Sequence, residues 1–241
     1  MISIIAAFQF LTIFPTIIKR MFTSQEMGRA VAWFPLVGIA LGFLLYGVNY
    51  LAQIFFPISV SATITLFAWI IFTRAFHLDG FMDTCDGLFG GFTPERRLEI
   101  MKDSRMGAFG TIGGILVLLT KYTALHSSVN LFAALILATT LGRFASPIAI
   151  YFFPYVRENG LGFEMKQQVT LKEIVIASLI TGITCLFISS PLSFLLMLAS
   201  VVISVLLSLY VMRLISGLTG DIYGAITTVV EMFVLIIFTI T

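Results

Sequence analysis

The chain has 241 residues, of which 59% are hydrophobic and only 11% are charged, less than half the roughly 25% charge of an ordinary soluble domain. Together with a mean hydropathy of +1.06, this composition excludes a soluble globular protein. The net charge of +2 also excludes a nucleic-acid-binding domain, which would carry a strong basic excess. We therefore expect an all-α, polytopic integral membrane bundle that forms one domain over residues 1–241 and has the lipid bilayer as a partner.

The N-terminal segment, residues 2–18, is apolar but short, and Pro15 interrupts it. It either crosses the membrane, re-enters it or lies along it. Lys19 and Arg20 follow the apolar run instead of preceding it, so we expect the segment to be retained and not cleaved as a secretory signal. The two cysteines, Cys85 and Cys185, provide no disulfide framework.

Runs of about 20 apolar residues mark the other candidate spans. They lie near residues 35–56, 58–75, 107–126, 129–153, 173–190, 192–212 and 221–241. With residues 2–18 left open, the sequence predicts about seven to eight spans. Gly38 and Gly42 have the small-xxx-small spacing that lets helices approach closely in lipid. Gly110 and Gly114 repeat this spacing, and for both pairs we expect a role in helix packing.

Basic residues are confined to alternate connections between the spans. The short connections around Pro57, over 126–130 and over 189–193 carry no Lys or Arg. The remaining connections carry Lys19, Arg20, Arg29, Arg96, Arg97, Lys102, Arg105, Arg157, Lys166, Lys172 and Arg213. The positive-inside rule makes the basic face cytoplasmic and predicts a multi-pass protein of the cell (plasma or inner) membrane.

Three acidic residues follow a helical period in FHLDGFMDTCDGLFGG, residues 76–91. Asp79, Asp83 and Asp86 lie at 0°, about 40° and about −20° around a helix, so their carboxylates share one narrow stripe. Their mutual repulsion favours a bound cation such as Mg²⁺, which takes oxygen ligands and bridges carboxylates to phosphates. The alternative, a solvated helix end, is disfavoured by the apolar flanks. His77 beside the stripe is either a ligand or a hydrogen-bonded structural residue.

A short amphipathic surface helix is predicted after the stripe, with Thr93 as its N-cap and Pro94 at its first position. Gly87, Gly90 and Gly91 precede it and relax the backbone. The segment carries the basic residues Arg96, Arg97, Lys102 and Arg105. Such side chains suit either a diphosphate or anionic lipid headgroups. For Lys102, Asp103 and Arg105, which lie close to the next span, we favour the site.

Other charges lie inside or at the start of predicted spans, where they are costly to bury. Arg143 and Glu231 are each about 15 Å deep, at a rise of 1.5 Å per residue, and we predict that they form a pair. This pair is either structural or the floor of a cytoplasm-facing cavity. Lys121, near the other end of its span, is expected to snorkel to the interface. Asp221, in SGLTGDIYGA, either caps a helix or supplies a further ligand or a group that orients a nucleophile.

A carboxylate stripe, a glycine-containing loop and a basic surface helix together indicate an enzyme that transfers a phosphoryl-type group from a diphosphate substrate. The rival interpretation is a cation or proton transporter whose ion path contains the three aspartates, Arg143 and Glu231. A transporter should carry paired carboxylates near the midplane, often on broken helices. The stripe instead lies at a membrane end beside basic residues, which favours the enzyme.

Over its whole length the sequence resembles the cobalamin synthase family, the adenosylcobinamide-GDP ribazoletransferases. The resemblance begins with FQFLTIFP, is most specific in HLDGFMDTCDGLFGG and ERRLEIMKDSRMGAFG, continues through Gly142-Arg143 and ends in GLTGDIYGA. A lone D-x3-D-x2-D would be weak, because the CDP-alcohol phosphotransferases also use an acidic metal motif. Three positions depart from the family pattern: Ile13 where many members have a basic residue, Ser216 where a Gly is common, and Thr228 where many members have an acidic residue.

The resemblance implies a Mg²⁺-dependent step in which a hydroxyl of α-ribazole, or of its 5′-phosphate, attacks the cobinamide-linked phosphorus of adenosylcobinamide-GDP and GMP leaves. Asp79, Asp83 and Asp86 would hold the metal. The other residues expected around the substrates are His77, Arg96, Lys102, Asp103, Arg105, Arg143, Asp221 and Glu231. A homo-oligomer is compatible with the sequence, which does not decide it.

Overall fold

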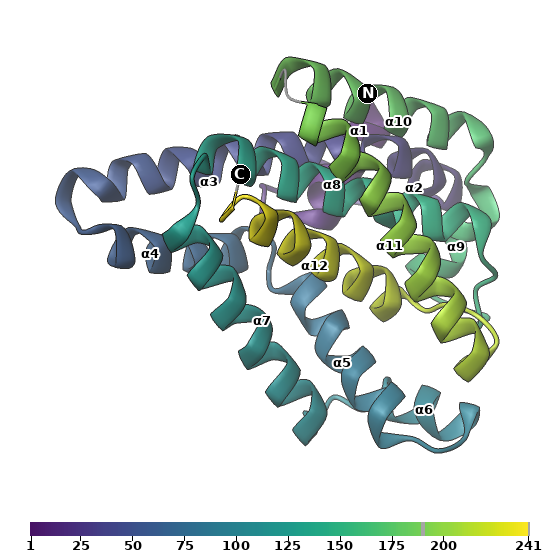
Figure 1. Cartoon of the computed structure of the whole chain (residues 1–241). Coiled ribbons are helices and arrows are strands. Elements are labelled where there is room, and N and C mark those ends of the chain that lie inside the picture. Colours follow the sequence, from purple (N-terminus) through teal and green to yellow (C-terminus); the bar gives the residue numbers. More distant parts are fainter. Residues whose placement is uncertain (189–190, 241) are drawn as a thin grey trace.

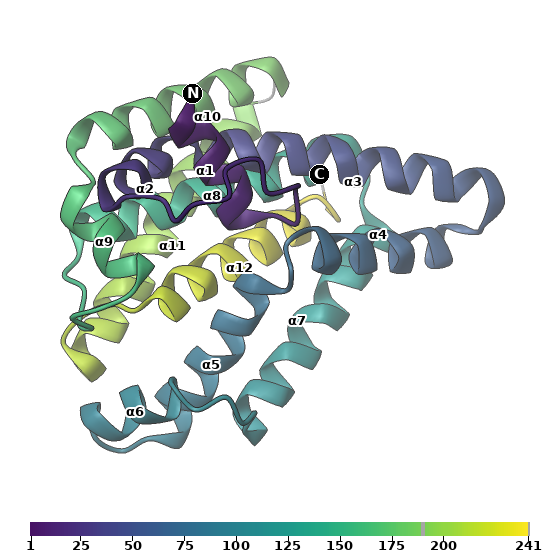
Figure 2. The same ribbon diagram turned by 180° about the vertical axis from the view of Figure 1, so that it is seen from behind.

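The computed structural model of the chain describes residues 1–188 and 191–240, and over these residues it is an assembly of α-helices with one isolated parallel bridge between Tyr155 and Leu218 (Figures 1 and 2). The helices in chain order are α1 (Ile2–Leu11), α2 (Ser24–Ala30), the 3₁₀ turn η1 (Val31–Trp33), α3 (Phe34–Phe55), α4 (Ile58–Phe72), α5 (Phe76–Gly90), α6 (Pro94–Ile100), α7 (Ala108–Ser127), α8 (Leu131–Phe152), α9 (Leu161–Gln168), α10 (Leu171–Ile188), α11 (Pro191–Ile215) and α12 (Gly220–Ile237). The expected all-α membrane protein is confirmed.

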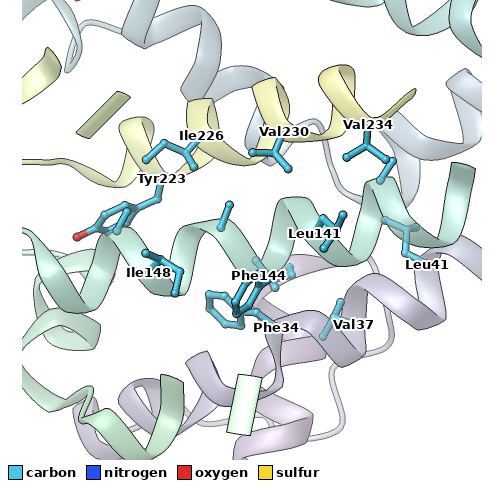
Figure 3. Packing of buried hydrophobic residues seen from close by; sticks show 14 of the residues in the cluster. Phe34, Val37, Leu41, Leu141, Phe144, Ile148, Tyr223, Ile226, Val230 and Val234 are labelled. Atoms are coloured by element: carbon cyan, nitrogen blue, oxygen red, sulfur yellow. The ribbon is translucent and has the colours of Figure 1, made fainter. Parts of the chain in front are cut away.

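Helix α8 is the central element, because α3, α10, α11 and α12 all pack against it. Figure 3 shows its apolar side chains between those of α12 and those of α3. The contact with α3 is close at the predicted glycine pair: a β-carbon on Gly42 would lie 2.7 Å from the Cα of Ile136. The hydroxyl of Thr139 donates a 2.7 Å hydrogen bond to the carbonyl of Gly38 across the same contact. Small residues thus set this interface.

Within the described residues, six helices are long and apolar enough to cross a membrane, and a seventh span results if α4 and α5 are counted together. The predicted span near residues 58–75 corresponds to α4, which passes as a span only together with α5. Helix α4 ends at Phe72, Arg74 and Ala75 adopt left-handed backbone angles, and α5 leaves at 85° to α4. The acidic stripe therefore lies on its own helix and does not continue α4.

The length of the N-terminal helix disfavours a span by this segment. Helix α1 has ten residues, about 15 Å of rise, which is half of what a span needs. The guanidinium of Arg74 donates 3.0 Å hydrogen bonds to the carbonyls of Gln9 and Phe10 and so closes the C-terminal end of α1. The bend between α4 and α5 thereby holds α1 in place. Part of the predicted short connection 189–193 lies outside the described residues.

Candidate functional site

Helices α5 and α12 cross at two glycines, and this crossing assembles the candidate site. A β-carbon on Gly80 would lie 2.9 Å from the carbonyl oxygen of Asp221, and one on Gly224 would lie 3.2 Å from the carbonyl oxygen of His77. Only residues without a side chain allow the two backbones to approach this closely. The approach brings Asp79, from the stripe, beside Asp221, 142 positions later in the sequence.

A cavity of about 280 Å³ opens beside this crossing. Its buried end is formed mainly by apolar and aromatic side chains, and its exposed end by charged and loop residues. Lining residues at the buried end include Leu11, Phe34, His77, Ser146, Ile150, Tyr223 and Thr227. Lining residues towards the exposed end include Asp79, Arg157, Asn159, Gly160, Leu161 and Asp221. An apolar pocket with a few convergent polar groups is the usual form of a small-molecule site.

Arg157 is the basic residue of the cavity, and our sequence analysis placed it only among the charges of a cytoplasmic connection. Its guanidinium donates a 2.7 Å hydrogen bond to the Oδ2 atom of Asp221, with side chains 19% and 20% exposed. The hydroxyl of Thr219 donates to the same oxygen at 3.2 Å. Arg157 and Asp221 are 64 positions apart in the sequence, so no local spacing signals the pair.

The segment that carries Arg157 is fixed by backbone hydrogen bonds to the segment before α12. The amide of Val156 donates to the carbonyl of Leu218 at 2.9 Å, and the amide of Leu218 donates to the carbonyl of Pro154 at 2.8 Å. Tyr155 also lines the cavity, and burial raises the pKa of its phenol, which stays neutral at physiological pH. Ser216, noted above as a departure from the family pattern, has φ of 61°, a conformation that favours glycine.

The three aspartates of the predicted stripe lie on α5, but they have different surroundings. Asp79 lines the cavity, and Asp83 is partly exposed within the field of Asp79, Asp86 and Asp221. Asp86 is buried, and its two carboxylate oxygens accept hydrogen bonds from the backbone amides of Gly107 and Gly110, each at 2.8 Å. A carboxylate at a helix N-terminus satisfies unpaired amides and favours the helix dipole. Asp86 therefore anchors α7 to α5.

The fit of a divalent cation depends on which oxygens are available. In the part of the chain that the structure describes, no three His, Cys, Asp or Glu side chains form a group that could hold a metal ion by themselves. Mg²⁺ needs no such cage, since it usually keeps several waters and takes one or two carboxylates together with substrate phosphates. Asp79 and Asp83 fit this requirement as hard oxygen donors, and both oxygens of Asp86 already accept protein hydrogen bonds.

The predicted surface helix is confirmed as α6, with the Thr93 hydroxyl accepting a hydrogen bond from the amide of Arg96 and Pro94 in its first turn. Its basic residues do not converge on the cavity lining. Arg96 pairs with Glu99 at 2.6 Å on the surface, and Lys102 is exposed.

Asp103 and Arg105 bind each other in the same region. The Nε and Nη2 groups of Arg105 donate three hydrogen bonds to the Asp103 carboxylate, the shortest of which is 2.6 Å long. These hydrogen bonds lower the pKa of Asp103 to about 2. Both residues lie outside the lining of the cavity.

The predicted pair of buried charges is confirmed, and it has a third member. Arg143 donates to the Oε1 atom of Glu231 at 2.6 Å, with side chains 0% and 2% exposed. The ammonium group of Lys121 donates to the other oxygen, Oε2, of the same carboxylate. It also lies 4.3 Å from the centre of the Trp69 ring. The expectation that Lys121 snorkels is therefore wrong: α7 packs against α12, which puts Lys121 beside a buried carboxylate.

His77 lies between this buried cluster and the cavity. It is 7% exposed, and its carbonyl accepts a 3.0 Å hydrogen bond from the hydroxyl of Thr228. Its side chain lines the cavity, and it also lines a smaller void of about 20 Å³ beside Lys121 and Glu231. Arg143 and Glu231 themselves do not line the main cavity, so their pairing is a feature of the helix core below it.

The family model and the related proteins that match this chain point to the same family. The family model described as cobalamin-5-phosphate synthase matches residues 3–239. A protein of Shewanella amazonensis named adenosylcobinamide-GDP ribazoletransferase is 34% identical over 96% of this chain and 92% of its own length. Proteins with the same name from Stutzerimonas stutzeri and Desulforamulus reducens are each 36% identical, over 98% and 97% of this chain and over 97% and 94% of their own lengths. No solved structure matches the chain.

Proposed function

The chain belongs to the cobalamin-5-phosphate synthase family and is thus a multi-pass membrane transferase of cobalamin synthesis, and we propose that the α5–α12 cavity is its active site. The reaction joins adenosylcobinamide-GDP to ribazole. The proposal adds that α-ribazole or its 5′-phosphate is the acceptor, that GMP is released, and that Mg²⁺ assists. The observation that carries it is the convergence of Asp79, Asp221 and Arg157 at the exposed end of one cavity.

In this site the basic residue binds the phosphate and the acidic residue acts on the attacking hydroxyl. Arg157 can offer two nitrogens to a phosphate, which suits the diphosphate of the donor substrate. When Arg157 turns to a phosphate, the Asp221 carboxylate loses its ion pair, keeps the hydrogen bond from Thr219, and can orient the ribazole hydroxyl and accept its proton. The hydroxyl oxygen then forms a bond to the cobinamide-linked phosphorus, and the bond from that phosphorus to the GMP oxygen breaks. The charges are balanced because GMP leaves with the electron pair of that bond.

In the proposal, Asp79 and Asp83 hold Mg²⁺, which when bound neutralises negative charge on the diphosphate oxygens. Asp86 has a positioning role, because its oxygens hold the N-terminus of α7 and thereby the direction of the stripe. His77 packs beneath the reacting groups and does not need to touch them. Arg96, Lys102, Asp103 and Arg105 bind the outer parts of the donor substrate or the lipid headgroups, since they lie on the surface near the stripe.

The proposal also places the site on the cytoplasmic face of the cell (inner) membrane. Three basic connections meet beside the cavity: Arg97 donates to the carbonyl of Leu214 at 3.1 Å, and Arg157 to the carbonyl of Met101 at 3.4 Å. The positive-inside rule assigns such a face to the cytoplasm. A transporter is not favoured, because the deep carboxylate of Glu231 is engaged by two cations, Lys121 and Arg143.

The test is GMP release by the protein in lipid nanodiscs, supplied with adenosylcobinamide-GDP, with α-ribazole or its 5′-phosphate, and with or without Mg²⁺. The wild type should release GMP in equal amount to the joined corrinoid, and omission of Mg²⁺ should abolish release. Asp79→Asn should lower turnover by roughly 100-fold, whereas the matched control Glu95→Gln, an exposed acid on α6 outside the cavity, should retain it. A folded wild type that forms no product with either acceptor would overturn the proposal.

A further inference from the structure

The cavity at the α5–α12 crossing has two ends of opposite chemistry. At the buried end the exposed fractions are 2% for Leu11, 3% for Phe34 and 1% for Ile150. At the other end Asn159 and Gly160 are exposed, and Arg157 and Asp221 are partly exposed. A ligand that fills the cavity must therefore be apolar at its inner end and carry polar groups at its outer end.

The size of the cavity distinguishes the two substrates. Its volume is about 280 Å³, close to the lower limit of the roughly 300–1,000 Å³ that small-molecule pockets have. A nucleoside made of one two-ring base and one ribose is of this scale. A corrin macrocycle that carries an adenosyl group and a guanosine diphosphate is several times larger and cannot enter.

We propose that this cavity binds the acceptor nucleoside, with the apolar two-ring base of ribazole at the buried end and its ribose hydroxyls at the mouth. The proposal rests on the proposed function and deepens it. The corrinoid then remains outside, and only its diphosphate reaches Asp79 and Arg157 at the mouth. This arrangement brings a ribose hydroxyl and the phosphorus together at the one place where the charged residues converge.

Aromatic side chains along the cavity wall give it a shape suited to a flat base. Phe34 and Phe76 line the cavity, and Tyr155 and Tyr223 form a tilted pair with ring centroids 5.9 Å apart at an angle of 34°. Figure 3 shows the ring of Tyr223 between the ends of α12 and α8, beside Ile148. Flat aromatic ligands gain contact area and favourable ring geometry against such walls.

A polar base fits this end less well. The Thr227 hydroxyl already donates to the carbonyl of Tyr223 at 3.0 Å. The Tyr223 hydroxyl is buried and has no hydrogen-bond partner among the described residues. The base of ribazole is dimethylbenzimidazole, whose single unsubstituted ring nitrogen accepts one hydrogen bond. A small movement of Tyr223 would let its hydroxyl donate that bond. Guanine has donors and acceptors on several edges, and the other polar side chains at this end, His77 and Ser146, are too few to satisfy all of them.

The first test is direct binding of nucleosides to the wild-type protein in nanodiscs, with no corrinoid present. α-Ribazole should bind saturably. The riboside that lacks the two methyl groups of the base should bind about tenfold more weakly, because less apolar surface is buried. Guanosine and GMP should not compete. Competition by guanosine, or equal binding of the base with and without methyl groups, would overturn the assignment.

The second test separates the substrates by kinetics. Ser146 lies at the buried end on α8, and Ser146→Met fills part of the cavity without adding a charge. It should raise the KM for α-ribazole by about tenfold or more and change the KM for adenosylcobinamide-GDP by less than about twofold. Tyr223→Phe should raise only the KM for ribazole, by roughly threefold to tenfold. A rise confined to the corrinoid KM, or no change in either KM, would refute the inference.

The two proposals fail in different ways. If the wild type releases no GMP with any acceptor, the proposed function is wrong. If GMP is released normally but the nucleoside does not bind alone, and if Ser146→Met and Tyr223→Phe leave its KM unchanged, only the assignment of the cavity is wrong. The binding test with different nucleosides uses the wild-type protein, so its outcome does not depend on the folding of a variant.

Discussion

The buried cluster of Lys121, Arg143 and Glu231 makes a sharp prediction about stability. It contains two cations and one carboxylate, with side chains 8%, 0% and 2% exposed, so its formal charge is +1. Glu231→Gln would raise that charge to +2 and leave both cations without a counter-ion. Lys121→Met would bring it to zero and leave the 2.6 Å bond between Arg143 and Glu231 in place. The two substitutions should therefore differ strongly although each removes one charged group.

The magnitudes follow from the cost of an unpaired buried charge. Breaking a buried ion pair by removing one partner destabilises a protein by about 3–5 kcal/mol. For a chain of this length, 1 kcal/mol shifts Tm by about 2–4 °C, so Glu231→Gln should lower Tm by about 6–20 °C. Lys121→Met loses the contact with the Trp69 ring, about 1 kcal/mol, but also removes the uncompensated charge. Lys121→Met should therefore lower the free energy of unfolding by no more than about 1–2 kcal/mol.

The assay is thermal unfolding in nanodiscs, followed by near-ultraviolet circular dichroism for the wild type and both variants under the same lipid and salt conditions. If Lys121→Met lowers Tm as much as Glu231→Gln does, the net charge of the cluster does not govern its stability and our explanation is refuted. The same holds if Glu231→Gln leaves Tm unchanged.

Substitutions at three further positions test how the site is assembled. Asp86→Asn directs an amide nitrogen at the backbone amide of Gly107 or Gly110 and should destabilise the protein by about 1–3 kcal/mol, measured as a fall in Tm; an unchanged Tm would contradict its anchoring role. Gly80→Ala puts a β-carbon 2.9 Å from the carbonyl oxygen of Asp221 and should separate α5 from α12. The rate of GMP release should therefore fall even at temperatures well below the Tm of the variant, and normal turnover would show that this close approach is not required. Arg157→Met should lower kcat/KM for adenosylcobinamide-GDP by at least about tenfold, and Arg157→Lys should restore only part of it; full activity of Arg157→Met would remove the residue from the site.

Several features could be predicted from local patterns in the sequence and from the depth of charges in the predicted spans. The period of Asp79, Asp83 and Asp86 predicts one stripe, and it lies on α5. Thr93 and Pro94 predict the start of α6, which is where it begins. The depth of Arg143 and Glu231 predicts their pairing, since charges in an apolar span have few alternatives to each other.

Only the tertiary structure decided the features that depend on how helices cross. The sequence predicts a surface position for Lys121, and the packing of α7 against α12 buries it beside Glu231. It treats Asp86 as equivalent to Asp79, and the approach of α7 engages Asp86 alone. The ion pair of Arg157 with Asp221 spans 64 positions and has no period to reveal it. Helical periodicity determines which side chains share a face of one helix, whereas the crossing of two helices depends on glycines such as Gly80 and Gly224, whose effect is visible only when both backbones are in place.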